Sequence, residues 1–298
     1  MNIAFFGDIH GRVYHLLAAV VTWQKRTSTV LDMVIQVGDF GAERLEKMTQ
    51  DINVFLRYPA NNPAQFDFLR VLYAQNQLAA HLRGMRQQIQ QPIYFLRGDH
   101  DEAAWLRQLS QGVQNQTIPI DPFDLFHYIP DGTIIHCGGM NLAFFGGVEH
   151  PERGKEGTEH DPAAFTALLG TKGGEVDVLI THEPPYGSST GFYGQTQGSS
   201  LVSKLIETIQ PRYHLAGHLH TMLGPKQYGP TTSLGLNQLG GLLKLKPRQH
   251  DPSRTLQQGT MALLHTDTGV LEFVTGHWLT EFGQECEALV EPLAACLY

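Results

Sequence analysis

One pattern, repeated five times, constrains the fold of this chain most strongly. Each copy is a short apolar run followed closely by Gly or Thr and then by Asp or His. The copies lead into the segments GDIHG, GDF, GDHD, THEPP and GHLH, in this order along the chain. Apolar runs that alternate with helical patterns predict a parallel sheet, whose strands all end at the same edge. The sequence therefore predicts an α/β fold with acidic and imidazole side chains gathered at one sheet edge.

Periodicity predicts the elements between these segments. Strands are expected at residues 2–6, 30–37, 92–96, 176–180 and 213–216, and helices at residues 15–25, 102–109 and 201–209.

Three further stretches depart from this alternation. Residues 43–90 predict a helical insertion with at least one long helix. Hairpin signals at residues 125–147 predict the start of a second sheet. Residues 222–298 predict a β-rich C-terminal portion with further antiparallel strands. The whole chain, residues 1–298, is interpreted as one domain.

Composition narrows the class of protein. The 298 residues include 21 Lys and Arg against 29 Asp and Glu, which gives a net charge of -8. Nonspecific DNA binders and proteins of anionic membranes concentrate basic residues, so both classes are disfavoured, although a local basic groove remains compatible. The three cysteines form no CxxC pair, and neither a signal peptide nor a membrane-length apolar segment is recognisable. We therefore expect a cytoplasmic protein without a membrane partner.

The five segments supply candidate ligands for metal ions. Carboxylates mixed with imidazoles suit Mn, Fe or Zn, and their number suffices for two ions. Side chains one residue apart, as in DxH and HxH, point to opposite sides of a strand. They can therefore bind together only where the chain turns beyond the strand end, which flanking glycines allow. One HxH alone is more often a packing pair, but five such segments in order favour a metal site. The candidates are Asp8, His10, Asp39, Asp99, His182, His218 and His220.

The ordered set DIH, GDF, GDHD, THEPP and GHLH resembles the calcineurin-like metallophosphoesterase superfamily, whose pattern is DxH, GD, GNH(D/E), H and GHxH. The resemblance spans about residues 3–221. It implies a four-layer αββα sandwich of two mixed sheets flanked by helices, with two divalent metal ions at the C-terminal ends of the strands. The ions would be Mn, Fe or Zn, with Mg or Ni as alternatives. One ion would be held by Asp8, His10, Asp39 and His220, and the other by Asp39, Asp99, His182 and His218.

The same resemblance implies a reaction. A hydroxide that bridges the two ions beside Asp39 would attack the phosphorus of a phosphodiester or phosphomonoester. His100 would stay off the metals and act on the leaving oxygen, by donating a proton or by hydrogen bonding in the transition state. Asp101 either orients His100 or caps a helix. The element GDFGAE lacks the DRG of protein Ser/Thr phosphatases. A nucleotide-type substrate is therefore favoured, with nucleic acid as a further option.

The insertion between GDF and GDHD gives the chain a distant resemblance in layout to RNA lariat debranching enzymes. Those enzymes commonly have cysteine at the position of Asp8, and the net charge of -8 gives RNA no support. Neither the natural substrate nor a protein partner is readable from the sequence.

Asp99 departs from the family pattern, which has asparagine at this position. Three aspartates and one hydroxide would neutralise two dications, whereas two aspartates would leave one positive charge. We expect tighter or differently selective metal binding with slower turnover, or an Asp99 that is protonated or displaced. The alternative function is a catalytically weak scaffold or protein-binding module. Asp99 is its only support, because His100 and the other motif positions are intact.

For several other residues, the sequence leaves two interpretations open. Arg12 and Arg97 each bind a substrate phosphate or are ordinary solvated arginines. Tyr186, in the Gly- and Ser-rich loop at residues 183–200, stacks on a substrate base or belongs to a plain connector. His150 and His160 flank another loop, from which either can face the substrate.

Overall fold

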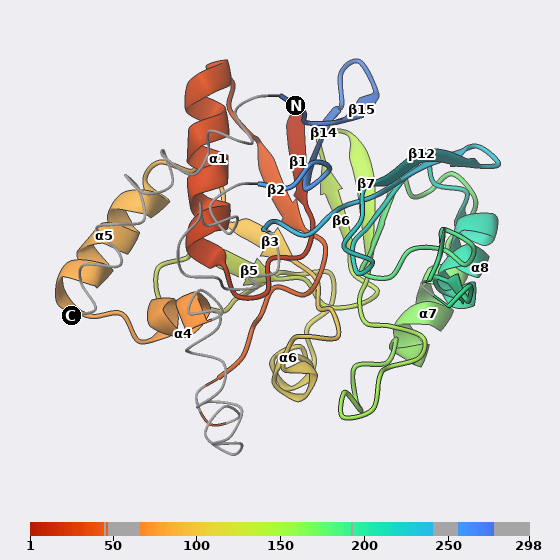
Figure 1. Ribbon diagram of the computed structural model, residues 1–298, viewed down its shortest axis with the longest axis horizontal. Coiled ribbons are helices and arrows are strands. Elements are labelled where there is room, and N and C mark those ends of the chain that lie inside the picture. Colours follow the sequence, from red (N-terminus) through yellow and green to blue (C-terminus); the bar gives the residue numbers. More distant parts are fainter. Residues whose placement is uncertain (45, 47–65, 192, 241–255, 277–298) are drawn as a thin grey trace.

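The computed structural model describes residues 1–44, 46, 66–191, 193–240 and 256–276. These residues form two mixed sheets packed face to face, with helices on both outer sides (Figure 1). The four-layer αββα sandwich expected from the sequence is thereby confirmed.

The first sheet has seven strands in the order β15–β14–β1–β2–β3–β5–β4. Strands β1, β2, β3 and β5 run parallel, whereas β14, β15 and β4 run antiparallel to their neighbours. The C-terminal ends of β1, β2 and β3 therefore lie along one edge, two to four residues before Asp8, Asp39 and Asp99. The strands are β1 (Asn2–Phe6), β2 (Met33–Gln36), β3 (Ile93–Phe95), β4 (Ile118–Pro119), β5 (Phe126–Tyr128), β14 (Met261–His265) and β15 (Val270–Phe273).

The second sheet has six strands in the order β12–β13–β11–β8–β7–β6. Its four inner strands, β7, β8, β11 and β13, run parallel. His182 follows β8, and His218 and His220 follow β11, so these imidazoles also leave C-terminal strand ends. The strands are β6 (Ile134–Cys137), β7 (Met140–Phe145), β8 (Val178–Thr181), β11 (Tyr213–Ala216), β12 (Leu223–Tyr228) and β13 (Thr231–Gly235), beside a separate hairpin of β9 (Ser189–Thr190) and β10 (Thr196–Gln197).

The described helices divide between the two outer faces (Figure 1). Helices α1 (Val13–Thr27), α4 (Asp67–Leu72), α5 (Asn76–Arg86) and α6 (Ala103–Leu109) share one apolar cluster with the first sheet. Helices α7 (Pro162–Leu169) and α8 (Ser200–Ile209) pack on the second sheet. None of the helices in the described ranges is both long and apolar enough to cross a membrane.

Alternating side chains of the inner strands build the core from both faces of each sheet. In β1, Ala4 and Phe6 face the helices, whereas Ile3 and Phe5 face the other sheet. Strand β7 repeats this pattern, with Phe144 between the sheets and Phe145 against α7 and α8. Three apolar layers result, and they hold the strand ends at fixed positions.

Two details of strand pairing differ from the sequence-based expectation. The hairpin signals at residues 125–147 do not all belong to the second sheet, because β5 pairs in parallel with β3 in the first sheet. The expectation of antiparallel strands at the C-terminal end is only partly right for β13, which pairs antiparallel with β12 but parallel with β11. A tight turn after β12 reverses the chain into β13 and so restores the direction of β11. Turn signals mark reversals but do not say which sheet the next strand joins.

The helical insertion expected at residues 43–90 contains α4 and α5, separated by a break at residues 73–75. Residues 45 and 47–65 of this insertion lie outside the described part. So do residues 241–255 and 277–298 of the expected C-terminal portion. The single-domain interpretation of the whole chain stays a prediction.

Candidate metal centre and active site

The seven candidate ligands lie together in two groups. In each group, one nitrogen or oxygen atom from each of four residues lies within 4.8 Å of the others. We define the first ligand group as Asp8, His10, Asp39 and His220, and the second ligand group as Asp39, Asp99, His182 and His218. Asp39 is common to both groups, in the arrangement that the family resemblance implies.

The donor set of each group fits a divalent cation. Each group offers two carboxylates and two imidazoles, a mixture that suits Mn, Fe or Zn. The three carboxylates of Asp8, Asp39 and Asp99 are at most 5% exposed. Buried charges of one sign are unfavourable unless they are paired or coordinate a metal. In the first group, the Nε2 atoms of His10 and His220 lie 2.9 Å apart, so both rings point at the same position.

The backbone of the ligands themselves makes the turns that the DxH and HxH motifs need. His10, Asp39, His218 and His220 have φ angles of 45°, 53°, 68° and 48°. Such left-handed conformations cost non-glycine residues about 1–3 kcal/mol each and cluster at functional sites. Four of the nine non-glycine residues with positive φ angles in the described part of the chain are therefore candidate ligands.

Two of the neighbouring glycines serve a different purpose from the one expected. Gly98 and Gly217 do not have positive φ angles. A Cβ atom on Gly98 would overlap Oδ1 of Asp39, and one on Gly217 would overlap Oδ1 of Asp8. These glycines leave room for ligand carboxylates rather than allow a turn.

Hydrogen bonds outside the ligand groups fix the orientation of the ligands. Nδ1 of His182 lies 3.0 Å from the carbonyl oxygen of Val37, which directs Nε2 towards Asp39 and Asp99. The backbone N–H of His218 donates to both oxygens of Asp8, each at 3.1 Å. The backbone N–H of His100 donates to Oδ1 of Asp39 at 2.8 Å. The strand-end loops therefore hold one another in place.

Asp101 binds two of these loops together. Its buried carboxylate accepts backbone N–H groups from Gly98 at 2.7 Å, Gly41 at 2.7 Å and Ala42 at 2.8 Å. Neither sequence-based reading of Asp101 matches these contacts, because the residue at the N-cap of α6 is Glu102. Two of these partners, Gly41 and Ala42, are far from Asp101 in sequence, so local motif reasoning does not detect the contacts.

Charge crowding shifts the pKa values of these groups. Burial, together with Asp8, Asp99 and Asp101, raises the pKa of Asp39 well above its ordinary value, despite the opposing effect of His182. Burial alone would raise the pKa of Asp8, but the hydrogen bond with His220 and the surrounding histidines hold it at about 2. Burial lowers the pKa of His10 to about 3. Burial and the neighbouring charges therefore raise the pKa of Asp39 and lower those of Asp8 and His10.

His100 lies at the rim of the two groups. Its ring is 4.9 Å from that of His10, and its Nε2 atom is 2.7 Å from Nζ of Lys155. Burial lowers the pKa of His100. The positive charge of Lys155 lowers it further, whereas the negative charge of Asp99 partly opposes this shift.

Lys155 is a residue that sequence reasoning missed. It lies in the loop between β7 and α7, and its Nζ atom is 2.5 Å from Oδ2 of Asp99. Two signals were available: the length of this Gly-rich loop and the unmatched charge of Asp99. Neither signal specifies which basic residue meets the carboxylate.

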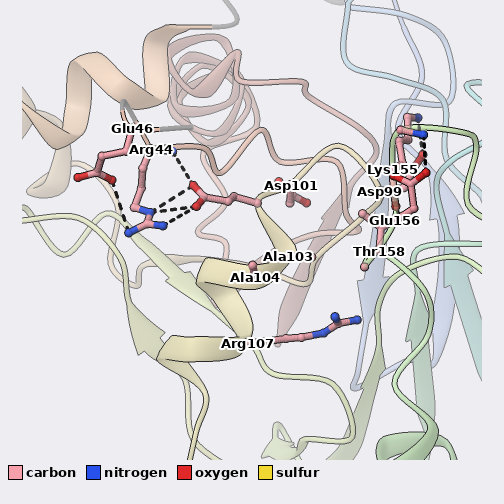
Figure 2. A pocket seen from close by; sticks show the side chains of 13 residues that line it. Arg44, Glu46, Asp99, Asp101, Ala103, Ala104, Arg107, Lys155, Glu156 and Thr158 are labelled. Carbon is pink, nitrogen blue, oxygen red and sulfur yellow. Dashed lines mark hydrogen bonds and ion pairs between the residues drawn. The ribbon is translucent and has the colours of Figure 1, made fainter. Parts of the chain in front are cut away.

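A cavity of about 350 Å³ opens beside Asp99 and Lys155 (Figure 2). Arg107 of α6 and Arg44 both line the cavity. The guanidinium of Arg44 is paired with Glu102, with 2.5 Å between Nη2 and Oε1. The cavity offers space next to the second ligand group, bordered by side chains of both charges.

The two substrate candidates Arg12 and Tyr186 lie in different surroundings. Arg12 is only 1% exposed, and its positive charge opposes the rise of the Asp67 pKa to about 7 that burial causes. Tyr186 is 55% exposed and lines a cavity of about 450 Å³ against α8, together with Tyr228. No metal ligand lines that cavity among the described residues. Both remain candidates from sequence only.

Arg97, His150 and His160 are also placed. Arg97 is fully buried and donates to Asp131 and to two backbone carbonyls. It is therefore a structural residue, and the expectation of a solvated or phosphate-binding arginine is wrong. His160 is buried and stacks on Phe145, with ring centroids 4.4 Å apart. The side chain of His150 is 91% exposed.

The model of the calcineurin-like phosphoesterase family matches residues 1–222, which is most of the chain. The chain belongs to the calcineurin-like phosphoesterase family. The resemblance read from the five motifs is thereby confirmed, and membership supports phosphoesterase chemistry that uses divalent metals.

Relatives of this calcineurin-like phosphoesterase include the UPF0046 protein K07C11.7 of Caenorhabditis elegans. It is 28% identical over 155 residues, which are 50% of this chain and 51% of that protein. The chain thus spans about half the length of this relative. The lariat debranching enzyme of Entamoeba histolytica is 21% identical over 267 residues, which are 80% of this chain and 69% of that enzyme.

One solved crystal structure shares the fold of this family member. It superposes with a TM-score of 0.54 at 15% sequence identity, and the match covers 92% of this chain and 98% of that chain. At this identity, the likeness supports the fold alone.

Proposed function

We propose that this protein hydrolyses phosphate esters with two divalent ions, one in each ligand group. The observation that carries the proposal is the shared Asp39, which joins two four-residue donor sets in a member of the calcineurin-like phosphoesterase family. The donor chemistry favours Mn, Fe or Zn, with Mg or Ni as alternatives. A bound pair of such ions lowers the pKa of water and offsets the charge of the phosphoryl oxygens.

The residues of the chain then have distinct tasks. Asp39 joins the two ligand groups, and the backbone N–H of His100 fixes the orientation of the Asp39 carboxylate. The His100 side chain stands outside both groups and faces the rim of the site. We assign it to the leaving oxygen, as a proton donor or hydrogen-bond donor.

A nucleotide-type phosphodiester or phosphomonoester is the proposed substrate. Support comes from the similarity to lariat debranching enzymes over most of the chain, so nucleic acid is included among the proposed partners. The cavity lined by Arg44 and Arg107 beside Asp99 provides room for a leaving group. A cytoplasmic location stays a prediction from the sequence.

Metal analysis combined with hydrolysis assays tests this proposal. The purified protein is stripped of ions, reloaded with Mn²⁺, and assayed with bis(p-nitrophenyl) phosphate and p-nitrophenyl phosphate. We expect two ions per chain and ion-dependent turnover of at least one ester. His100→Ala is expected to retain both ions and to lose about 100-fold or more in turnover.

A matched control is His136→Ala, since His136 lies on the edge strand β6 and bonds only Asn141 among the described residues. This variant should keep both ions and full activity. A wild-type protein that binds ions but turns over neither ester, and that His100→Ala does not change further, would favour the scaffold alternative. A protein that binds no divalent ion would contradict the proposal.

A further inference from the structure

Lys155 contacts both the residue that departs from the family pattern and the proposed leaving-group residue. Its Nζ atom lies 2.5 Å from Oδ2 of Asp99 and 2.7 Å from Nε2 of His100. The side chain is 21% exposed and forms one wall of the cavity shown in Figure 2, where it lies directly against Asp99. Glu152 is a weaker neighbour, with 3.6 Å between Oε2 and Nζ.

The two oxygens of Asp99 have separate surroundings. Oδ1 faces the second ligand group, at 3.3 Å from Nε2 of His182 and 3.3 Å from Nδ1 of His218. Oδ2 faces Lys155. An asparagine with its carbonyl oxygen towards the ligand group would turn its NH₂ group towards the ammonium. An amide NH₂ and an ammonium are both donors, so the lysine requires a carboxylate at this position.

Hydrogen bonds from a buried arginine hold the loop that carries Lys155. The buried guanidinium of Arg97 donates to the backbone carbonyls of Thr158 at 3.0 Å and Glu159 at 2.7 Å. Arg97 is also paired with Asp131 at 2.7 Å. The hydrogen bonds of Arg97 therefore hold the loop so that Lys155 lies near Asp99.

We propose that Lys155 is a positioning residue that forms a matched charge pair with Asp99. The lysine holds Asp99 with Oδ1 towards the second ligand group and cancels the negative charge that aspartate adds relative to asparagine. The centre thereby keeps the charge of the usual family pattern and its attraction for phosphate. This inference rests on the proposed function, because it concerns the same pair of ions.

Charge alone sets the direction of the expected effects. Without the ammonium of Lys155, the centre is more negative, so cations bind more tightly and anions more weakly. Without the negative charge of Asp99, the centre is more positive, so cations bind more weakly and anions more tightly. At distances of a few ångströms, one unit of charge changes such affinities by about tenfold or more, even with strong solvent screening.

Calorimetric titration of the ion-stripped protein with Mn²⁺, and inhibition by inorganic phosphate, test the pair. Lys155→Met is expected to bind Mn²⁺ about tenfold more tightly and phosphate about tenfold more weakly. Asp99→Asn should shift both affinities in the opposite directions. The double variant Asp99→Asn/Lys155→Met should return to within about threefold of the wild type. Lys155→Arg keeps the charge and should bind phosphate nearly as the wild type does.

Lys204→Met is the matched control, because it removes an exposed lysine of α8 that is paired with Glu207. A merely structural role of Lys155 would weaken both Mn²⁺ and phosphate binding in Lys155→Met, without rescue by Asp99→Asn, and would overturn the inference. Affinities unchanged in Lys155→Met would also overturn it. In both cases a wild type that binds two ions leaves the proposed function standing, whereas a wild type that binds no ion overturns both.

Discussion

The two ligand groups have the same chemical composition but different surroundings. Each contains two carboxylates and two imidazoles and shares Asp39. In the first group, His220 lies 2.9 Å from Asp8, and the backbone N–H of His218 donates to the same carboxylate. In the second group, Asp99 is also paired with Lys155. The two candidate ion positions therefore differ in charge, although their donors match.

This difference shows that a donor list does not determine the electrostatics of a centre. The motifs name the atoms that can touch an ion. A residue from an unrelated loop decides how much negative charge those atoms retain, and so how the two positions rank in affinity. We expect the first position to fill before the second.

The largest effect should come from the carboxylate that both groups share. Asp39→Asn is expected to abolish binding of both ions and to lower turnover more than about 100-fold, since even residues behind a ligand cost 10- to 100-fold. Asp8→Asn should remove only the ion of the first group. Elemental analysis after dialysis distinguishes the two variants. If Asp39→Asn and Asp8→Asn lost the same number of ions, the assignment of one ion to each ligand group would be contradicted.

Gly217→Ala should disturb the first group without removing any donor. A Cβ atom at this position overlaps Oδ1 of Asp8, so the carboxylate or the loop must shift. We expect about one ion per chain and a loss of turnover between the wild type and Asp8→Asn. Gly84→Ala is the control, because a Cβ there meets open space in α5. Full occupancy in Gly217→Ala would show that the first group tolerates displacement.

The smallest effect concerns His214, whose hydrogen-bond partner Thr181 directly precedes the candidate ligand His182. It is fully buried between the hydroxyls of Thr181 and Ser233, and burial lowers its pKa to about 3. The unfolded chain binds a proton near pH 6.5, whereas the folded chain does not. The stability contributed by neutral His214 is therefore complete above pH 6.5 and is lost as the pH falls towards 3.

Urea unfolding of the wild type and of His214→Asn at pH 7.5 and pH 5.5 measures this contribution. The variant should be less stable at pH 7.5, because it loses buried hydrogen bonds. The difference should shrink by about 1 kcal/mol at pH 5.5. A difference that does not change with pH would mean that His214 is not the titrating group.

Much of the scaffold was predictable because it depends on local periodicity. Apolar runs located β1, β11 and α8 nearly to the residue, since both faces of each inner strand are buried. The parallel pairing of β13 with β11 was missed, because the period of a strand carries no information on its direction. The break between α4 and α5 was missed for a similar reason, since apolar spacing continues across it.

The site was predictable to the extent that ligands follow strand ends. All seven candidate ligands come together as the motifs indicate. The contacts of Asp101 with Gly41 and of Lys155 with Asp99 join residues about 60 positions apart in the chain, and no spacing rule connects them. Such contacts depend on loop conformation, which the sequence pattern does not encode.

Arg97 has a further consequence for ligand binding. Its guanidinium links the end of β3 in the first sheet to the backbone after β7 in the second. A loop of this length would ordinarily lose conformational entropy each time it closed on a ligand, at about 1–2 kcal/mol per residue fixed. Here that entropy is lost when the protein folds. An incoming phosphate meets Lys155 already in place, and its binding energy is not spent on ordering the chain.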